Sequence, residues 1–192
     1  MSKPSGAAAR SDVSRAHHTH RWRAVLAGIA VLWVVLLFAS PRWARAATVS
    51  ERPGGQALIA AVVWSVGHRV CHQRPERSFH LHGTPMAVCG RCTGLYVSGA
   101  AALLAGSLTS RRKPSPRRST RSTDGAEGWP AIRGRVTLDP RARLLAIAAV
   151  PTLLTWSLEM AGVWDPGTMM RAAAAVPLGA AAGWFIARAM DD

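Results

Sequence analysis

Long apolar stretches constrain the fold of this chain more than any other sequence feature. The most hydrophobic of them, residues 24–40, has 17 residues, which is the lower limit for a helix that spans a bilayer. Further apolar stretches cover residues 86–108, 144–162 and 171–189. We therefore expect an all-α integral membrane bundle of four to five helices. Such a chain would be a multi-pass protein of the cell membrane, with the lipid bilayer as its surroundings.

Two stretches leave the number of spans and the start of the mature chain open. Residues 57–70 are apolar but short and end in His68 and Arg69, so they cross only by tilting or form a half-span against other helices. Residues 24–46 also imitate a secretory signal, because basic residues precede the apolar core and a small-x-small motif follows it. We favour an uncleaved span, since the core is long for a signal and further spans follow.

The formal net charge of +14 is concentrated outside the apolar stretches. Basic residues collect in residues 1–23 and in residues 109–143, where ten basic residues face three acidic ones. This distribution fits the positive-inside bias of membrane proteins better than nucleic-acid binding, so no nucleic-acid partner is expected. We predict a disordered basic tail at 1–23 and a flexible cytoplasmic linker at 109–143 that binds anionic lipid headgroups. Membrane helices with a Cys/His loop then occupy residues 24–108, and a helix hairpin occupies residues 144–190.

A cytoplasmic linker determines the direction of the helices on either side of it. The loop at 71–85 then lies outside the cytoplasm, and a half-span at 57–70 keeps the basic amino terminus inside, whereas a full span does not. Residues scattered over a hundred positions are thereby expected at one membrane surface: Cys71, His72, Cys89, Cys92, Glu159 and Arg171. In the alternative interpretation, Glu159 and Arg171 only pair with each other across the short turn between their helices.

Small residues recur every four positions on two of the expected helices. The positions are Gly94, Ser98, Ala102 and Gly106 in one helix and Ala175, Gly179, Gly183 and Ala187 in the last one. Such stripes allow close contact between helices, although alanine-rich helices often carry them without it.

The stretch from Cys71 to Tyr96 contains all three cysteines of the chain. Cys89 and Cys92 are three residues apart at the expected start of a helix, where the helix dipole favours thiolates. Thiolates suit a soft divalent metal, and Cys71 together with His72, His68, His80 or His82 can complete a tetrahedral set. We therefore predict a site for zinc or another transition metal with the ligands Cys71, His72, Cys89 and Cys92.

Two other chemistries fit the same cysteines and leave enzymatic activity open. The first is a membrane thiol-disulfide oxidoreductase that cycles between dithiol and disulfide. The second is a structural disulfide from Cys71 to one of the other two cysteines. Five nearby residues are expected to support the site: Arg77 and Arg91 by charge, Ser78 by hydrogen bonding, Gly94 by close backbone approach and Tyr96 at the membrane interface.

The central motifs resemble those of a known family. They read Cys71-His72-Gln73, then Pro75-Glu76-Arg77-Ser78-Phe79, then Cys89-Gly90-Arg91-Cys92-Thr93-Gly94-Leu95-Tyr96. In this pattern the chain is similar to the bacterial integral membrane proteins grouped as domain of unknown function family 2085. The family also carries a helix with an acidic or amide side chain, followed by an Arg and a Gly-rich helix. Glu159, Arg171 and Gly179 resemble these features. The resemblance implies a small multi-span membrane protein and no particular activity.

Overall fold

The computed structural model of the chain describes residues 6–49, 54–110 and 139–190. Within these residues, helices predominate and one small antiparallel sheet is present, which confirms the all-α fold class. In chain order the elements are α1 (Gly6–Val49), α2 (Gly55–Val70), the short 3-10 helix η1 (Pro75–Arg77), β1 (Ser78–Leu81), β2 (Thr84–Cys89), α3 (Gly90–Ser110), α4 (Pro140–Met160) and α5 (Gly167–Ala189).

Four of these helices are long and apolar enough to cross a membrane. The segments are Arg21–Thr48 of α1, Gly90–Thr109 of α3, Pro140–Met160 of α4 and Gly167–Ala189 of α5. With 16 residues, α2 is about 24 Å long, which is shorter than a hydrocarbon layer of about 30 Å. The chain is therefore a multi-pass membrane protein whose described part has four candidate spans, and α2 is not one of them.

The amino-terminal tail, for which composition predicted disorder, is mostly helical in the structure. Helix α1 begins at Gly6 and continues into the span without a break. An alanine run at residues 7–9 favours helix, and neither proline nor glycine interrupts the chain between Gly6 and Gly28. The structure therefore has helix from Gly6 onward, residues 1–5 lie outside the described part, and the assignment of 1–23 as a separate disordered tail stays a prediction.

The two ends of the predicted linker at 109–143 are helical as well. Helix α4 begins at Pro140, which suits the first turn because no backbone N–H is needed there. The carboxylate of Asp139 caps this helix by accepting a hydrogen bond of 3.0 Å from the backbone N–H of Arg141. The rest of the linker, residues 111–138, lies outside the described residues, so lipid-headgroup binding there stays a prediction.

A β-hairpin stands where the apolar stretch at 86–108 was expected to begin as a helix. Strands β1 and β2 pair with Leu81 opposite Thr84, so only His82 and Gly83 form the turn. Both turn residues have positive φ, 54° and 79°, as a two-residue hairpin turn requires. The span therefore begins at Gly90. The preceding apolar residues Met86, Ala87 and Val88 are fully buried against α1 and α2 as a strand.

Helices α3 and α5 pack closely through the two stripes of small residues. A methyl group added at Gly94 would overlap the backbone oxygen of Ala172, and one added at Gly179 would overlap the hydroxyl of Ser98. Because a side chain at either glycine would separate the helices, glycine is needed there for close approach. The structure therefore confirms the close helix contact that the stripes predicted.

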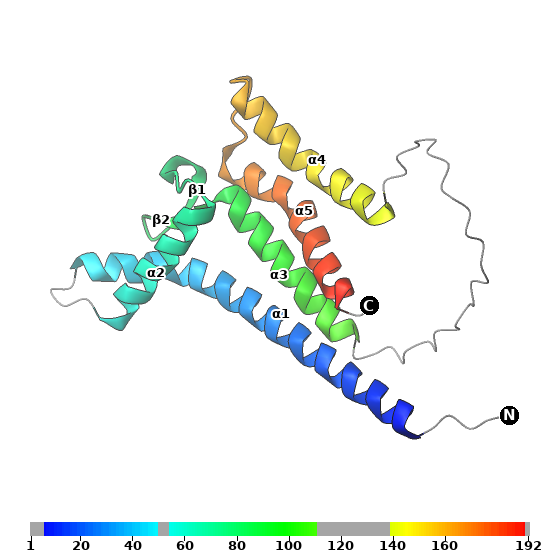
Figure 1. The fold of residues 1–192 in the computed structure, drawn as a ribbon. Coiled ribbons are helices and arrows are strands. Elements are labelled where there is room, and N and C mark those ends of the chain that lie inside the picture. The colour runs from blue at the N-terminus through cyan, green and yellow to red at the C-terminus, as the bar shows by residue number, and fades with distance from the viewer. Residues whose placement is uncertain (1–5, 50–53, 111–138, 191–192) are drawn as a thin grey trace, which may run out of the picture.

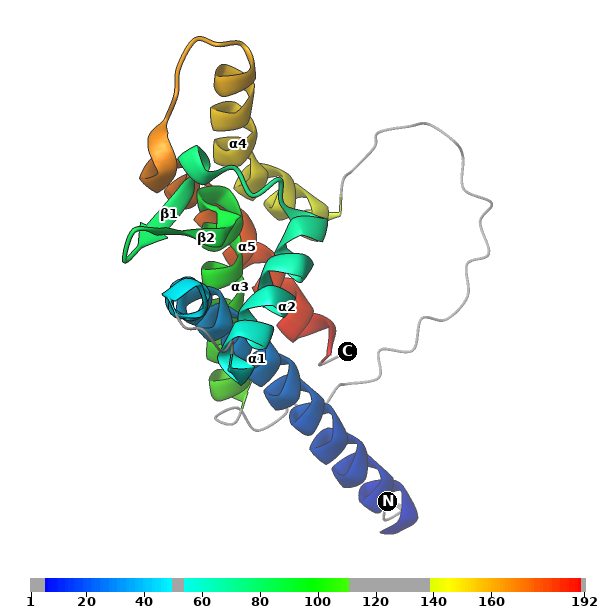
Figure 2. The ribbon, with the colours of Figure 1, turned by 90° about the vertical axis from the view of Figure 1, so that its left-hand side faces the viewer.

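The bundle has two ends, and different parts of the described elements lie at each, as Figures 1 and 2 show. The hairpin, α2 and the connection between α4 and α5 lie toward one end, while the carboxyl ends of α3 and α5 and the amino-terminal part of α1 lie toward the other. At the second end, the guanidinium group of Arg23 donates a hydrogen bond of 2.7 Å to the backbone oxygen of Gly106. The long helices thus bring segments from both halves of the sequence to the hairpin end.

Candidate metal centre

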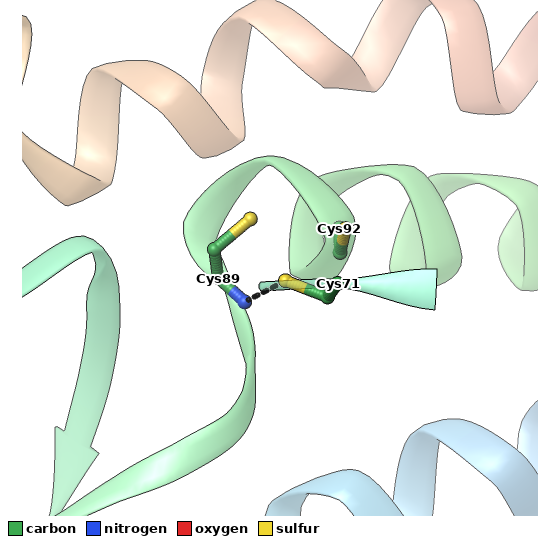
Figure 3. Close-up of side chains that lie close together, drawn as sticks. All are labelled: Cys71, Cys89 and Cys92. Atoms are coloured by element: carbon green, nitrogen blue, oxygen red, sulfur yellow. Dashed lines mark hydrogen bonds between the residues drawn. The ribbon is translucent and has the colours of Figure 1, made fainter. Parts of the chain in front are cut away.

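The three cysteines of the chain meet at the hairpin end of the bundle. Their sulfur atoms all lie within 4.8 Å of one another, and none forms a disulfide in the structure. Figure 3 shows Cys71, Cys89 and Cys92 converging from two segments of the chain. Cys71 is buried, and the other two are partly buried. The expected grouping of Cys71 with the C-x-x-C pair is therefore present.

Secondary structure positions each of the three sulfur atoms. Cys71 directly follows α2, and its backbone N–H donates a hydrogen bond of 2.9 Å to the oxygen of Gly67. Cys89 ends strand β2, and Cys92 lies in the first turn of α3. The site therefore depends on three elements that reach one point by different routes.

Gln73 ties two of these elements together. Its side-chain amide donates hydrogen bonds of 2.8 Å to the backbone oxygen of Trp64 in α2 and to that of Ala87 in β2. Close packing reinforces the contact, because a methyl group at Gly67 would overlap the oxygen of Ala87. The sequence shows Gln73 only as part of a motif and does not predict this structural role, since no sequence pattern indicates which carbonyls an amide will reach.

The surroundings of Cys71 favour its thiolate form. The backbone N–H of Cys89 donates a hydrogen bond of 3.2 Å to the sulfur of Cys71. Hydrogen bonding from the thiol of Cys89, followed by that of Cys92, holds the pKa of Cys71 well below its ordinary value, although burial acts in the opposite direction. A sulfur that is readily deprotonated is a good metal ligand.

The three sulfurs fit the donor set of a soft metal ion. In a tetrahedral zinc site, sulfur atoms about 2.3 Å from the metal lie roughly 3.8 Å apart, so the observed cluster needs only a small contraction. The aromatic rings of Trp33 and Tyr96 meet edge to face at 6.1 Å beside the core that holds the cysteines. Packing on this side limits the access of water.

The histidines stand apart from the sulfur cluster. Among the described residues, the group close enough to share one ion contains the three cysteines only. His72 is exposed, as are His68, His80 and His82. The structure therefore supplies three ligands at one point, and the assignment of His72 as the fourth stays a prediction.

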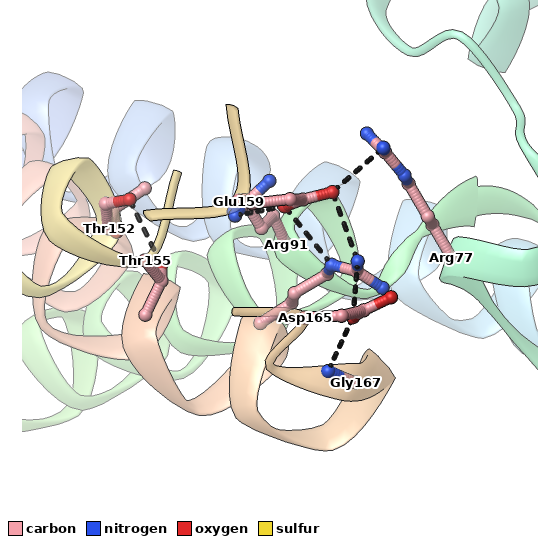
Figure 4. Close-up of polar contacts among 8 residues, drawn as sticks. Arg77, Arg91, Thr152, Thr155, Glu159, Asp165 and Gly167 are labelled. Carbon is pink, nitrogen blue, oxygen red and sulfur yellow. Dashed lines mark hydrogen bonds and ion pairs between the residues drawn. The ribbon is translucent and has the colours of Figure 1, made fainter. Parts of the chain in front are cut away.

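A second cluster of polar residues surrounds Glu159 near the end of α4 (Figure 4). Its carboxylate accepts from Arg77 at 2.9 Å, from Arg91 at 2.7 Å and from Arg171 at 3.0 Å. Arg171 also pairs with Asp165 at 2.8 Å. The side chains of Glu159 and Arg171 are 6% and 3% exposed, so this pair is buried.

The Glu159 cluster settles how Glu159 and Arg171 relate to the cysteine loop. They pair with each other, as the alternative interpretation held, and Glu159 also reaches Arg77 and Arg91 in the loop. Because Arg91 lies between Cys89 and Cys92 in the sequence, the ion pair connects the C-x-x-C turn to α4. Asp165 was missed as a member, although it is the only charged residue in its connector.

The remaining supporting residues act within the scaffold. The hydroxyl of Ser78, which is buried, donates a hydrogen bond of 3.0 Å to the backbone oxygen of Arg74. Gly94 lies against α5, and Tyr96 packs beside the cysteine core. These contacts hold the hairpin and the start of α3 in place around the sulfurs.

One family model and two curated relatives match the chain, and none of their descriptions names an activity. The family model described as "Predicted membrane protein (DUF2085)" matches residues 71–185, which is more than half of the chain. "Uncharacterized protein MJ1492" of Methanocaldococcus jannaschii is 33% identical over 66 residues, covering 34% of this chain and 40% of the relative. An uncharacterized protein of Methanothermobacter thermautotrophicus is 50% identical over 28 residues, covering 15% of this chain and 25% of the relative.

These relatives limit what can be transferred to the chain. Both are archaeal, so the bacterial origin implied by the resemblance is not supported. The matched regions span less than half the length of either relative. No solved structure matches the chain. Any specific role for the site therefore has to be argued from its geometry.

Proposed function

The chain belongs to the DUF2085 family of predicted membrane proteins, and from that premise we propose that it is a multi-pass membrane protein with a metal-binding cysteine centre. Cys71, Cys89 and Cys92 are the proposed ligands, and zinc is the favoured ion. One observation carries the proposal: three sulfurs from separate elements lie within 4.8 Å of one another. Thiolate ligands select zinc and other soft transition metals over magnesium or calcium.

The fourth ligand is proposed to be His72. This residue follows Cys71 directly, and its exposed side chain needs only a change of rotamer and local backbone to approach the sulfurs. With four protein ligands the site would be structural, whereas a water molecule in the fourth position would leave it open for binding or catalysis. A bound ion would join α2, β2 and α3 at one point and stabilise the hairpin end.

We further propose that the centre faces away from the cytoplasm. The sequence stretch between α3 and α4 supports this orientation under the positive-inside rule, because residues 109–143 carry ten basic residues against three acidic ones. Arg21 and Arg23 in α1 and Arg188 in α5 add to the charge at that end. Arginines at the cysteine end, such as Arg45 and Arg77, act in the opposite direction and are fewer. On the cysteine side, the connector between α4 and α5 has no basic residue between Met160 and Arg171.

Metal analysis of the purified full chain tests the proposal. Wild-type protein should contain about one zinc per chain, and Cys92→Ser should lose most of it because one of three sulfur ligands is removed. His82→Ala is the matched control, since His82 is exposed at the hairpin turn and outside the cluster. Negligible metal in the wild type after growth in zinc-supplemented medium would sink the proposal.

The role of His72 is measured separately by competition with a chelator. His72→Ala should weaken zinc binding by about tenfold or more while retaining a full complement of metal at high zinc concentration. An affinity equal to that of His82→Ala would show that His72 is not a ligand.

A thiol-disulfide oxidoreductase is the second candidate, favoured by three free thiols in mutual proximity. Two thiols would form one disulfide, releasing two protons and two electrons, and a membrane quinone would accept both and become a quinol. Thiol trapping in cells, with and without reductant, separates the candidates. Metal-bound thiols stay reduced, redox-active thiols change state, and a structural disulfide between Cys71 and another cysteine stays oxidised until reductant is added.

A further inference from the structure

The cluster around Glu159 holds more positive than negative charge. Both oxygens of Glu159 are already occupied: Oε1 accepts from Arg77 and Arg171, and Oε2 accepts from Arg91 and Arg171. Three guanidinium groups therefore face two carboxylates, those of Glu159 and Asp165, which leaves one positive charge in excess. We call these five residues the arginine cluster.

The arginine cluster also has unused hydrogen-bond donors. The Nε atom of Arg91 is buried and has no acceptor among the described residues. A buried N–H without an acceptor is costly, and Oε2 of Glu159, which accepts from another nitrogen of Arg91, is already shared with Arg171. Asp165 gives little compensation, because its side chain is 76% exposed and its charge is screened by water.

The position of the arginine cluster suits a phosphate group. Glu159 is the penultimate residue of α4, Arg171 lies in the second turn of α5, and Arg91 lies in the first turn of α3. These are the ends of candidate spans, so the cluster lies at the depth of lipid headgroups. The side chain of Arg77 is 32% exposed and provides an opening to this boundary.

From this geometry we propose that the arginine cluster binds a phosphate-type anion, supplied either by a lipid headgroup or by free phosphate. Arg77 and Arg91 would donate charge-assisted hydrogen bonds through the nitrogens that Glu159 does not use. The anion would balance the excess charge and leave the Glu159 pairs in place. The proposal does not depend on a metal at the cysteines, so it stands or falls separately from the proposed function.

Binding is measured on the full chain purified in a neutral detergent, with inorganic phosphate as one probe. In a second arm, the chain is tested against vesicles of phosphatidylglycerol and vesicles of phosphatidylcholine. Saturable phosphate binding alone would indicate a free anion, and a phosphatidylglycerol preference alone would indicate a headgroup. Both arms are run with zinc-loaded protein and after chelation, and the same result is expected.

Two variants and a matched control make the test specific. Arg77→Gln should weaken binding by about tenfold, because one charge-assisted donor is lost. Arg74→Gln should leave it unchanged, since Arg74 is an exposed arginine three residues from Arg77 and is not among the three arginines that pair with Glu159. It also controls for attraction of acidic vesicles to basic residues elsewhere in the chain.

Asp165→Asn should tighten binding several-fold. It removes a negative charge from the cluster, while the amide oxygen can still accept from the backbone N–H of Gly167, as the carboxylate does at 2.9 Å. This gain keeps the test decisive if Arg77→Gln folds poorly. Two results would overturn the proposal: absence of saturable binding in both arms, or equal binding by wild type and Asp165→Asn.

Discussion

Gln73 is the residue that holds the cysteine loop against α2 and β2. Its positive φ of 48° turns the chain directly after Cys71, and its amide bridges two backbone oxygens in different elements. The amide thus adds a hydrogen bond to one carbonyl of α2 and one of β2 and links the two elements. The Gln73 side chain therefore holds the loop in place, and this fixes the position of Cys71 relative to Cys89 and Cys92.

We expect Gln73→Ala to lower the free energy of unfolding by about 1–3 kcal/mol, because the backbone oxygens of Trp64 and Ala87 each lose the hydrogen bond from the Gln73 amide. Thermal unfolding in detergent, followed by circular dichroism, measures the change. Glu76→Ala is the control, since Glu76 is exposed in the same loop and should shift stability by less than about 0.5 kcal/mol. Equal effects of the two variants would contradict this role of Gln73.

At the scale of the element, α3 and α5 form the closest helix pair that supports the site. Gly94→Ala should force the helices apart, because the added methyl group overlaps the backbone oxygen of Ala172, which cannot rotate away. We expect a loss of about 2 kcal/mol or more in thermal unfolding. Gly28→Ala in α1 should be neutral or slightly stabilising, since nothing lies within 4 Å of its added methyl group. A stable Gly94→Ala protein would refute the tight packing.

The link between α4 and the cysteine turn leads to another prediction. Glu159→Gln removes the charge that three arginines share, so three guanidinium groups remain with only Asp165 opposite them. Because the Glu159 side chain is only 6% exposed, we expect a destabilisation of about 3 kcal/mol or more. Unfolding of wild type and variant at low and high salt measures it. The exposed Glu76→Gln serves as control, and an equally small effect of both would show that the ion pairs are unimportant.

Sequence reasoning succeeded for the elements whose signal is length and apolar composition. The four spans follow from stretches too long and too apolar for a soluble helix. The small-residue stripes indicated faces capable of close contact, but not that α3 and α5 are the pair that makes it. The hairpin was missed because a short apolar run such as 86–89 fits a buried strand and a helix start equally well. Its turn signal was only His82-Gly83, which is weak without a strand prediction beside it.

The site was predicted less completely than the spans. Cys71 could be grouped with Cys89 and Cys92 because thiols and histidines are concentrated in one loop next to an apolar helix. The contacts of Glu159 with Arg77 and Arg91 could not be predicted, since they depend on how α4 is oriented on α5 and how the loop folds over both. In the tail at 1–23 two signals compete, because its basic charge favours disorder and its alanines favour helix.

At the scale of the whole molecule, orientation in the membrane is the main proposal that remains to be tested. A single reporter cysteine at His82→Cys should react with an impermeant thiol reagent on intact cells, because this turn residue is exposed at the hairpin end. Arg143→Cys, at the exposed amino end of α4, should react only after permeabilisation. The reverse pattern would place the cysteine centre on the cytoplasmic side. Wild-type protein supplies the background from the native cysteines.

The proposed metal centre depends on the three sulfurs acting together as ligands of one ion. X-ray absorption spectroscopy at the zinc edge of the purified full chain tests this directly. We predict three sulfur neighbours at about 2.3 Å and one nitrogen or oxygen neighbour at about 2.0 Å. A first shell of nitrogen and oxygen only, or one identical in wild type and Cys71→Ser, would contradict the cysteine centre.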